Sequence, residues 1–415
     1  MEAAGIILTG LTGLAVVWAV INICCWPRVK VLRHHLRPTG RFGQHTIGAH
    51  GAIIAPVSVL IPARDEERNL PAVLDSLMQQ GAEVVEILVL DDQSSDGTAE
   101  VVQEYTRRDP RIRLISGRRR PAGWFGKTWA GKQLADEACS RWMLFLDADV
   151  VLAPGAVNAI LDAAAEHDAT YVSCWPRFEM ASFWEFVGVP MLNFATLTTF
   201  LWPLSFRRPK DDRMIVASGA CMLMHRRAYE AVGGHQCCAY GLLEDHAFAR
   251  AWRRCGERSV TLDGQDVVSV RMYRSREEVV RGFQKNAAKV FRGPGILWAF
   301  IAIQIIAFVS PFLLAPLSLL TTYPADGTLL WIAMGNVLLA RTLLSMAYRM
   351  PAWIALLHPL GIIGMLWVVL LSWYSITSGR GVTWKGRTYF TRPAVDRAGS
   401  SAASSAKYVP GAAQR

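Results

Sequence analysis

The sequence predicts an α/β domain with a mostly parallel sheet, flanked by transmembrane helices at its N-terminal and C-terminal ends. Two observations predict the domain: short apolar runs alternate with amphipathic segments from residue 57 to 166, and acidic residues follow several of the apolar runs. A third predicts the membrane helices. Of the 415 residues, 52% are hydrophobic and only 19% are charged, which is too apolar for an ordinary soluble enzyme.

Within the domain, strand and helix alternate in a way that favours parallel strands joined by right-handed crossovers. We predict strands at 57–61, 86–90, 112–116 and 143–146. Helices are predicted between and after them, at 66–79, 98–107, 134–139 and 154–166. Pro62 is expected to end the first strand, because proline has no N–H to donate to a sheet.

Four apolar stretches are long enough to cross the ~30 Å hydrocarbon layer: 4–26, 296–320, 328–347 and 352–377. The first is expected to be an uncleaved anchor that ends in the cytoplasm, because basic residues follow it: Arg28, Lys30, Arg33, Arg37 and Arg41. Three further crossings would place the basic tail (Arg380, Lys385, Arg387) outside, against the same rule. This leaves open that one stretch does not span. Pro359 and Gly361 make the last one a candidate for a broken helix.

These features divide the chain into five parts. We predict a transmembrane anchor (1–27), a basic linker (28–55), a cytosolic catalytic domain (56–295), C-terminal transmembrane helices (296–378) and a basic, then disordered tail (379–415). The apolar stretch 183–205 lies inside the domain and contains Pro190 and Pro203. We expect it to be a helix in the membrane interface, with a buried core helix as the alternative. The expected location is the cell (plasma or inner) membrane, as a multi-pass protein.

The net charge of +10 is suited to phosphates and anionic lipid headgroups. The sequence contains no DNA-binding motif, so nucleic acid is not an expected partner. Its eight cysteines include no C-x-x-C pair, which favours reduced thiols over zinc or disulfides.

Carboxylates follow the predicted strands at three places, and ligands of open α/β sheets bind outside the carboxyl ends of strands. We therefore expect these pairs to meet at one edge: Asp91/Asp92, Asp147/Asp149 and Glu244/Asp245. Asp147 and Asp149 are hard oxygen ligands of the kind that Mg²⁺ or Mn²⁺ prefers. Such a metal would neutralise a diphosphate leaving group. Lys127, in a predicted loop with Gly123 and Gly126, is a candidate clamp for the phosphates.

Three of these segments resemble family 2 glycosyltransferases, which are inverting enzymes with the GT-A fold. They read Ile-Pro-Ala-Arg-Asp-Glu at 61–66, Leu-Asp-Asp-Gln-Ser-Ser-Asp-Gly-Thr at 90–98 and Asp-Ala-Asp at 147–149. The resemblance covers about 55–295. Segments 123–127 and 270–275 look like membrane-bound members that glycosylate hopanoids, carotenoids or related lipids, and 379–387 is similar to carotenoid glycosyltransferases.

The resemblance implies a role for each site residue. Asp147 and Asp149 would hold the metal and the nucleotide diphosphate, and Asp245 would be the catalytic base. The other residues expected to bind the nucleotide sugar are Pro62, Ala63, Glu66, Asp92, Lys127 and Glu244. Some membrane-bound relatives carry a Gln-x-x-Arg-Trp motif, which this chain lacks. Candidates for the missing phosphate contact are Arg271, Arg274, Gln284 and Lys285, with an interfacial basic helix as the alternative.

The predicted activity is an inverting, metal-dependent transfer of a sugar from a nucleotide donor, expected to be UDP-linked, to a hydroxyl-bearing membrane lipid. The lipid would be of carotenoid, hopanoid or glycerolipid/sphingolipid type, and the cofactor Mn²⁺ or Mg²⁺. Two alternatives stay within glycosyl transfer: a polyprenyl-phosphate acceptor, which would need no base, and a polysaccharide synthase. A third, of another class, is a catalytically inactive membrane scaffold.

Overall fold

The structure is a computed structural model that describes residues 2–31, 46–47, 53–200, 202–239, 243–285, 287, 291, 293–320 and 327–389. The basic residues Arg33, Arg37 and Arg41 and the tail beyond Tyr389 lie outside these ranges, so the predictions for them stay predictions.

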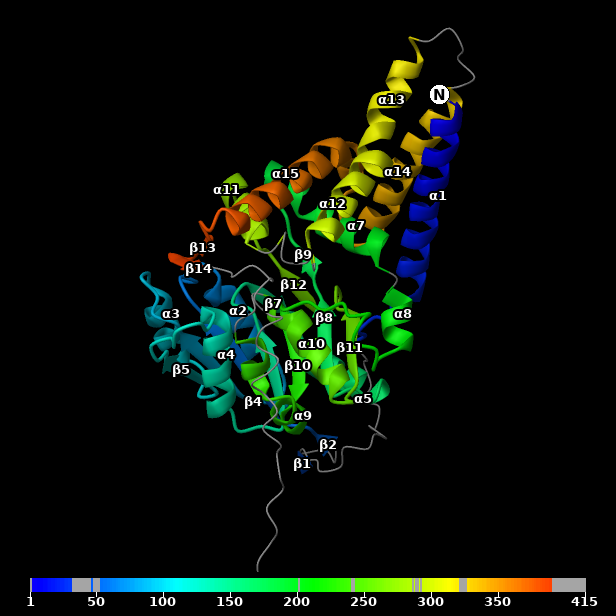
Figure 1. The fold of residues 1–415 in the computed structure, drawn as a ribbon. Coiled ribbons are helices and arrows are strands. Elements are labelled where there is room, and N and C mark those ends of the chain that lie inside the picture. The colour runs from blue at the N-terminus through cyan, green and yellow to red at the C-terminus, as the bar shows by residue number, and fades with distance from the viewer. Residues whose placement is uncertain are drawn as a thin grey trace, which may run out of the picture.

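A seven-stranded, mostly parallel sheet forms the centre of the domain (Figure 1). Its order is β11 (Ser259–Asp263), β8 (Tyr171–Trp175), β10 (Cys221–His225), β6 (Trp142–Leu146), β3 (Val57–Ala63), β4 (Val84–Asp91) and β5 (Ile112–Ser116). Only β10 runs antiparallel to its neighbours in this sheet of the described chain. A smaller sheet follows the order β7 (Val150–Leu152), β12 (Val268–Val270) and β9 (Arg177–Phe178). The predicted α/β class is confirmed.

Helices cover both faces of the large sheet because the strands alternate their side chains between two cores. Val59 and Ile61 pack in one core with α2 (Leu70–Met78), α3 (Thr98–Thr106) and α5 (Ala156–Glu166). Leu60 lies in the other core, with α4 (Gly126–Glu137) and α10 (Glu244–Arg254). The remaining short elements of the domain are β1 (Thr46–Ile47), β2 (Ile53–Ile54), α9 (Arg226–Ala231), η1 (Gly234–Cys238) and α11 (Arg276–Gln284).

Three local predictions were wrong: the end of the first strand, the backbone after β6 and the position of Lys127. Strand β3 continues through Pro62, which is tolerated because pairing with β6 has already ended at Leu60. Strand β6 ends at Leu146, and Asp147 then begins a tight turn in which its carbonyl accepts from the N–H of Val150 at 3.1 Å, in place of the expected extended run. Lys127 lies in the first turn of α4 instead of a loop.

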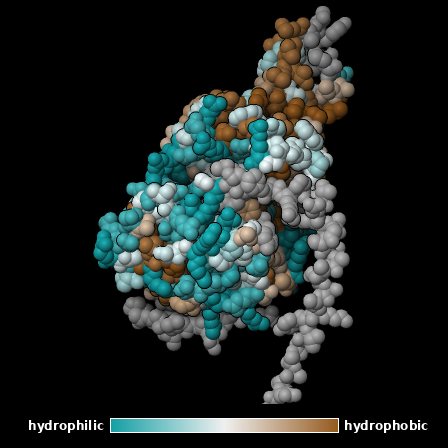
Figure 2. Space-filling view, turned by 60° about the vertical axis from the view of Figure 1, so that its left-hand side comes forward, coloured by the Kyte–Doolittle hydropathy of each residue, from teal (hydrophilic) through white to brown (hydrophobic). Residues whose placement is uncertain are grey.

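The apolar helices pack together on one side of the domain (Figure 1). They are α1 (Glu2–Cys25), α14 (Thr328–Ala347) and a continuous helical stretch of α12 (Pro294–Ile303), η3 (Gln304–Val309) and α13 (Ser310–Ser318). Gly5 lets α1 approach α14 closely, because a Cβ there would lie 2.9 Å from Cβ of Leu329. By length and composition these stretches and Ala352–Thr377 are four candidate membrane spans. Hydrophobic side chains gather on these helices, while the sheet domain is largely hydrophilic (Figure 2).

The stretch 183–205 forms three short helices, broken near the two prolines: α6 (Phe183–Gly188), α7 (Pro190–Thr199) and α8 (Trp202–Arg207). Phe183 and Trp184 are exposed, whereas Phe194 and Leu197 are buried. Asn22 of α1 donates to the carbonyls of Leu197 and Phe200. The stretch therefore lies between the sheet domain and the apolar helices, and combines features of the interfacial and the buried alternatives.

The last apolar stretch takes another direction. It comprises η5 (Ala352–Leu357) and α15 (His358–Thr377), and α15 runs across the line of α1, α13 and α14 (Figure 1). Gly361 permits a close contact with α6 and α7, since a Cβ there would lie 2.8 Å from the carbonyl oxygen of Val187. A hairpin of β13 (Val382–Trp384) and β14 (Arg387–Tyr389) follows α15.

Candidate active site

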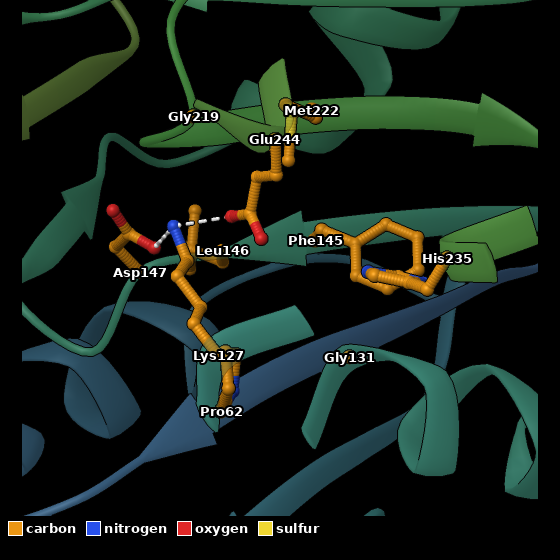
Figure 3. Close-up of a pocket in the computed structure, with 10 residues that line it drawn as sticks. All are labelled: Pro62, Lys127, Gly131, Phe145, Leu146, Asp147, Gly219, Met222, His235 and Glu244. Carbon is orange, nitrogen blue, oxygen red and sulfur yellow. Dashed lines mark ion pairs between the residues drawn. The ribbon is translucent and has the colours of Figure 1, made fainter. Parts of the chain in front are cut away.

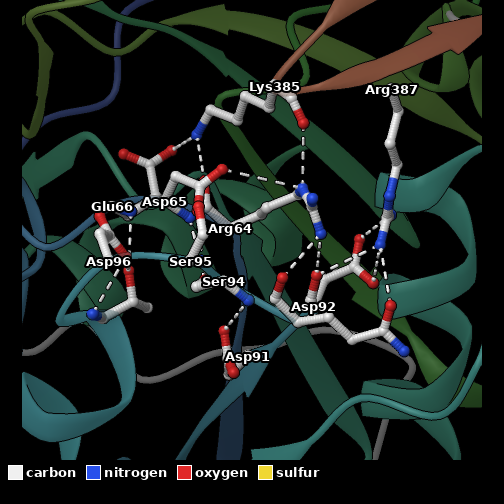
Figure 4. Close-up of polar contacts among 12 residues, drawn as sticks. Arg64, Asp65, Glu66, Asp91, Asp92, Ser94, Ser95, Asp96, Lys385 and Arg387 are labelled. Atoms are coloured by element: carbon white, nitrogen blue, oxygen red, sulfur yellow. Dashed lines mark hydrogen bonds and ion pairs between the residues drawn. The ribbon is translucent and has the colours of Figure 1, made fainter.

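The loops after β3 and β4 are locked together at the edge of the sheet (Figure 4). The N–H of Asp65 donates to Oγ of Ser94 at 3.0 Å, and the N–H of Ser95 donates to Oδ1 of Asp65 at 2.8 Å. Asp65 and Gln93 both adopt a positive φ, of 51° and 59°. Such strained residues persist only where the surroundings fix them, and they concentrate at functional sites.

Of the acidic residues in these loops, two have local structural roles. Asp91 accepts from the N–H of Ser94 at 3.0 Å, and Asp96 accepts from the N–H of Thr98 at 3.1 Å, as expected for a cap. Asp92 and Glu66 instead pair with cations of the β13–β14 hairpin, Arg387 and Lys385. The sequence-based interpretation had placed neither cation in the site.

Lys127 joins two of the predicted acidic clusters (Figure 3). Its Nζ lies 2.5 Å from Oδ1 of Asp147 and 2.7 Å from Oε1 of Glu244. Its partial burial would lower the pKa of Lys127, but the two carboxylates outweigh this effect and hold the pKa well above its usual value. Lys127 therefore bridges the carboxyl end of β6 and the N-terminal end of α10 as a permanent cation.

The carboxylate of Asp149 is repelled by two other carboxylates. Burial and repulsion from Asp147 and Glu66 raise its pKa to about 7. No group of three or more His, Cys, Asp or Glu side chains within the described ranges is arranged to hold a metal ion. The residues nevertheless suit Mg²⁺ or Mn²⁺, because such ions are commonly held by one or two carboxylates together with substrate phosphates and water.

Glu244 and Asp245 open helix α10 and point into the same region. The side chain of Glu244 is only 8% exposed, and burial raises its pKa despite the nearby Lys127. Asp245 accepts from the N–H of His246 at 2.8 Å, which holds its carboxylate but leaves the second oxygen for other partners. A Cβ on Gly219 would lie 3.7 Å from Oδ2 of Asp245 and 3.5 Å from Nζ of Lys127. Gly219 thus keeps space open between the two groups.

The four candidate phosphate contacts fall at different places. Arg271 pairs with the fully buried Glu185 of α6, so it holds that helix instead of the site. Gln284 donates to Ser375 of α15. Arg274 donates to Oδ1 of Asn69, whose amide donates to Glu66, so it borders the β3 loop.

Lys285 is the candidate whose charge interacts with Asp147 and Asp149. Burial and repulsion from Lys127 lower its pKa to about 8, against the attraction of Asp147 and Asp149. The role of Lys285 as a phosphate contact stays a prediction, while Arg271 and Gln284 have partners elsewhere.

A pocket extends from Asp147 and Lys127 under Glu244, and Pro62 and Gly219 form part of its wall (Figure 3). The other residues of its lining, which the sequence did not predict, are Gly131, Phe145, Leu146, Met222 and His235. His235 is buried and its Nδ1 lies 2.7 Å from the hydroxyl of Tyr229. Burial lowers the pKa of His235 to about 3, so it is neutral and structural. All eight cysteines lie in the described ranges and are free.

Comparisons with known proteins find similar sequences over much of the chain. Residues 58–233 match the sequence model described as glycosyl transferase family 2. A 4,4'-diaponeurosporenoate glycosyltransferase of Staphylococcus haemolyticus is 30% identical over 241 residues, which are 57% of this chain and 62% of that relative. One of the same name from Staphylococcus aureus (strain MRSA252) is 25% identical over 80% of this chain and 88% of its own length. Residues 58–233 are therefore similar in sequence to family 2 glycosyltransferases.

Among solved structures, a mannosyltransferase of Pyrobaculum calidifontis in complex with GDP-Man and Mn²⁺ is 17% identical, with a TM-score of 0.49. The match covers 89% of this chain and 98% of that one.

Proposed function

We propose that this protein transfers a sugar from a nucleotide donor, UDP-linked, to a membrane lipid, with inversion at the anomeric carbon. The observation that carries the proposal is the position of Lys127, which joins Asp147 of the predicted donor site to Glu244, next to the predicted base Asp245. The residues proposed to bind the donor and to activate the acceptor would thus act at one edge of the sheet.

In the proposed reaction, Asp245 takes the proton of the acceptor hydroxyl as the hydroxyl oxygen bonds to the anomeric carbon. The bond from that carbon to the diphosphate breaks, and its electron pair leaves with the nucleotide diphosphate. Lys127 supplies a fixed cation beside the phosphates. Asp147 and Asp149 would hold Mn²⁺ or Mg²⁺, which neutralises diphosphate charge when bound.

The relatives suggest a second acceptor chemistry. Both are named for diaponeurosporenoate, the anion of a carotenoid carboxylic acid. A carboxylate is already ionised at neutral pH, so its attack on the anomeric carbon needs no base. A polyprenyl phosphate shares this property.

We further propose that α15 lies in the membrane interface and that only α1, α12–α13 and α14 cross. Before it, Arg349 pairs with Asp266 of the sheet domain; after it, Lys385 pairs with Glu66. Both ends of the segment are therefore held on the same side, whereas the ends of a spanning helix lie on opposite sides. This arrangement puts the basic tail in the cytoplasm, in agreement with the positive-inside rule.

The experiment that tests the activity is sugar transfer by the purified protein. It uses radiolabelled UDP-glucose, Mn²⁺ or Mg²⁺ and lipid extracts that contain hydroxylated or carboxylated carotenoids, with an EDTA control. We expect a labelled lipid that disappears with EDTA. A panel of nucleotide sugars that yields no labelled lipid would contradict the proposal and favour the scaffold alternative.

Asp245→Asn distinguishes the acceptors. With a hydroxyl acceptor we expect kcat to fall about 10²- to 10⁴-fold, the size of a general-base contribution. With a carboxylate or phosphate acceptor, transfer should persist. Asp136→Asn, an exposed carboxylate on α4, is the control.

A further inference from the structure

The C-terminal hairpin returns to the donor loops across more than 290 residues of chain. Arg387 contacts both carboxylate oxygens of Asp92, Nη1 at 2.5 Å from Oδ2 and Nη2 at 3.2 Å from Oδ1 (Figure 4). The two side chains are only 15% and 6% exposed. A bidentate pair of this kind fixes the orientation of the carboxylate as well as its charge.

Lys385 makes a second, independent attachment. Its Nζ contacts a carboxylate oxygen of Glu66 and donates to the carbonyl of Arg64 at 2.6 Å. In return, Nε of Arg64 donates to the carbonyl of Lys385 at 3.1 Å. The hairpin turn is thereby held against the β3 loop by side chain and backbone together.

The backbone of the hairpin turn has a conformation that is unfavourable for a lysine. Lys385 and Gly386 form the two-residue connection of the hairpin, since Trp384 is paired with Arg387. Both have positive φ, of 45° and 71°. Turns with two positive φ values favour Asn, Asp or Gly at the first position. A lysine is strained there, and its ammonium group is what the favoured residues would not provide.

Negative charge surrounds the proposed donor pocket. The carboxylates that surround the proposed donor pocket are Glu66, Asp92, Asp147, Asp149 and Glu244, and the donor itself is an anion. Cations on the pocket wall are needed for a diphosphate to approach such a surface. Lys385 and Arg387 neutralise the carboxylates of the β3 and β4 loops, Glu66 and Asp92. Lys127 pairs with Asp147 instead.

We propose that the β13–β14 hairpin forms a wall of the donor pocket, in which Arg387 and Lys385 are positioning residues for Asp92 and Glu66 and reduce the repulsion of the nucleotide diphosphate. The inference rests on the proposed function. It assigns to the C-terminal segment a share in donor binding, in addition to the sheet-edge motifs.

The test is equilibrium binding of UDP, with Mn²⁺, to the full-length protein in detergent. Lys385→Asn removes the cation but suits the turn, and Arg387→Lys keeps the charge but loses the bidentate pair. We expect UDP to bind about tenfold more weakly to Lys385→Asn and Arg387→Ala than to the wild type, the size of one lost charge-assisted contact. In Arg387→Lys the loss of affinity should be smaller. The matched control is Arg380→Ala, an exposed cation of the same segment that lies over the Tyr374 ring.

Unchanged binding of UDP to Lys385→Asn and Arg387→Ala would overturn the inference. Tighter binding would overturn it as well, because the hairpin would then compete with the donor. Wild-type protein that binds no nucleotide from a panel would instead refute the proposed function itself, along with the inference. The kinetic counterpart is a higher KM for the donor with an unchanged KM for the lipid.

Trypsin provides a readout that needs no variant. UDP should protect the bonds after Lys385 and Arg387 from cleavage, while the bond after Arg380 is cut at the same rate. Faster cleavage after Lys385 in the presence of UDP would contradict the inference.

Discussion

At the scale of single residues, Lys127 is a cation that neutralises two carboxylates. Its ammonium group contacts Asp147 and Glu244 at once, and the Glu244 side chain is 8% exposed. Removal of the cation would leave two nearby carboxylates facing each other, one of them buried.

We expect Lys127→Met to raise the donor KM at least about tenfold and to lower stability by about 1–2 kcal/mol. The loss is smaller than for a fully buried pair because the lysine side chain is 42% exposed. Transfer kinetics and thermal unfolding in detergent measure the two effects. Lys132→Met, which breaks an exposed pair one turn along α4, should change neither, and equal effects of both substitutions would contradict this account.

The position of Lys127 also shows what the sequence could and could not predict at this scale. Asp92, Asp147 and Glu244 could be singled out as candidates because each follows or precedes a recognisable element, a purely local signal. Their ion pairs with Arg387 and Lys127 were not found, because charge partners distant in the chain leave no periodic pattern.

At the scale of elements, helix α6 is fixed by one buried acid. Glu185 forms a capping box with Ser182 and accepts from Arg271 of the chain after β12. Burial alone would raise the pKa of Glu185, but Arg271 and the N–H groups of Ser182 and Ala181 bring it down to about 2. The interaction therefore ties the helices under the membrane segments to the small sheet.

This depressed pKa gives a pH-dependent prediction. A carboxyl with a folded-state pKa of about 2, against an ordinary 4.5, stabilises the protein fully above pH 4.5. The contribution is lost as pH falls through the folded-state value. We expect Glu185→Gln to cost about 3 kcal/mol at most at pH 7, with a difference from wild type that shrinks between pH 4.5 and pH 2. Melting curves over this range measure it, with the exposed Glu179→Gln as control. A pH-independent difference would show that packing, not charge, is responsible.

At the scale of the whole molecule, the open question from the sequence was how many times the chain crosses the membrane. Apolar content alone does not separate a spanning helix from one that lies along the surface, and α15 satisfies the composition of both. The proposal that α15 stays on one side rests on the contacts at its two ends, Arg349 with Asp266 and Lys385 with Glu66.

The topology is testable with fused reporters. We expect a green fluorescent protein after Arg415 to fluoresce in a bacterial host, because the fusion point is cytoplasmic. Alkaline phosphatase fused after Leu320, beyond α13, should be active, because that point is external. If the fluorescent protein after Arg415 is dark, and a phosphatase fused at that same point is active, α15 crosses the membrane.

The hairpin has a last consequence, for the order in which the protein is made. Synthesis proceeds from the N-terminus, and early domains fold first, so the sheet and its acidic motifs are complete long before residues 382–389 leave the ribosome. By then every apolar helix of the C-terminal region has already emerged. On the proposed role of the hairpin, the donor pocket gains its final side only in chains whose apolar C-terminal helices are already made. A ribosome-bound intermediate would then carry all the sheet-edge carboxylates but bind the nucleotide more weakly.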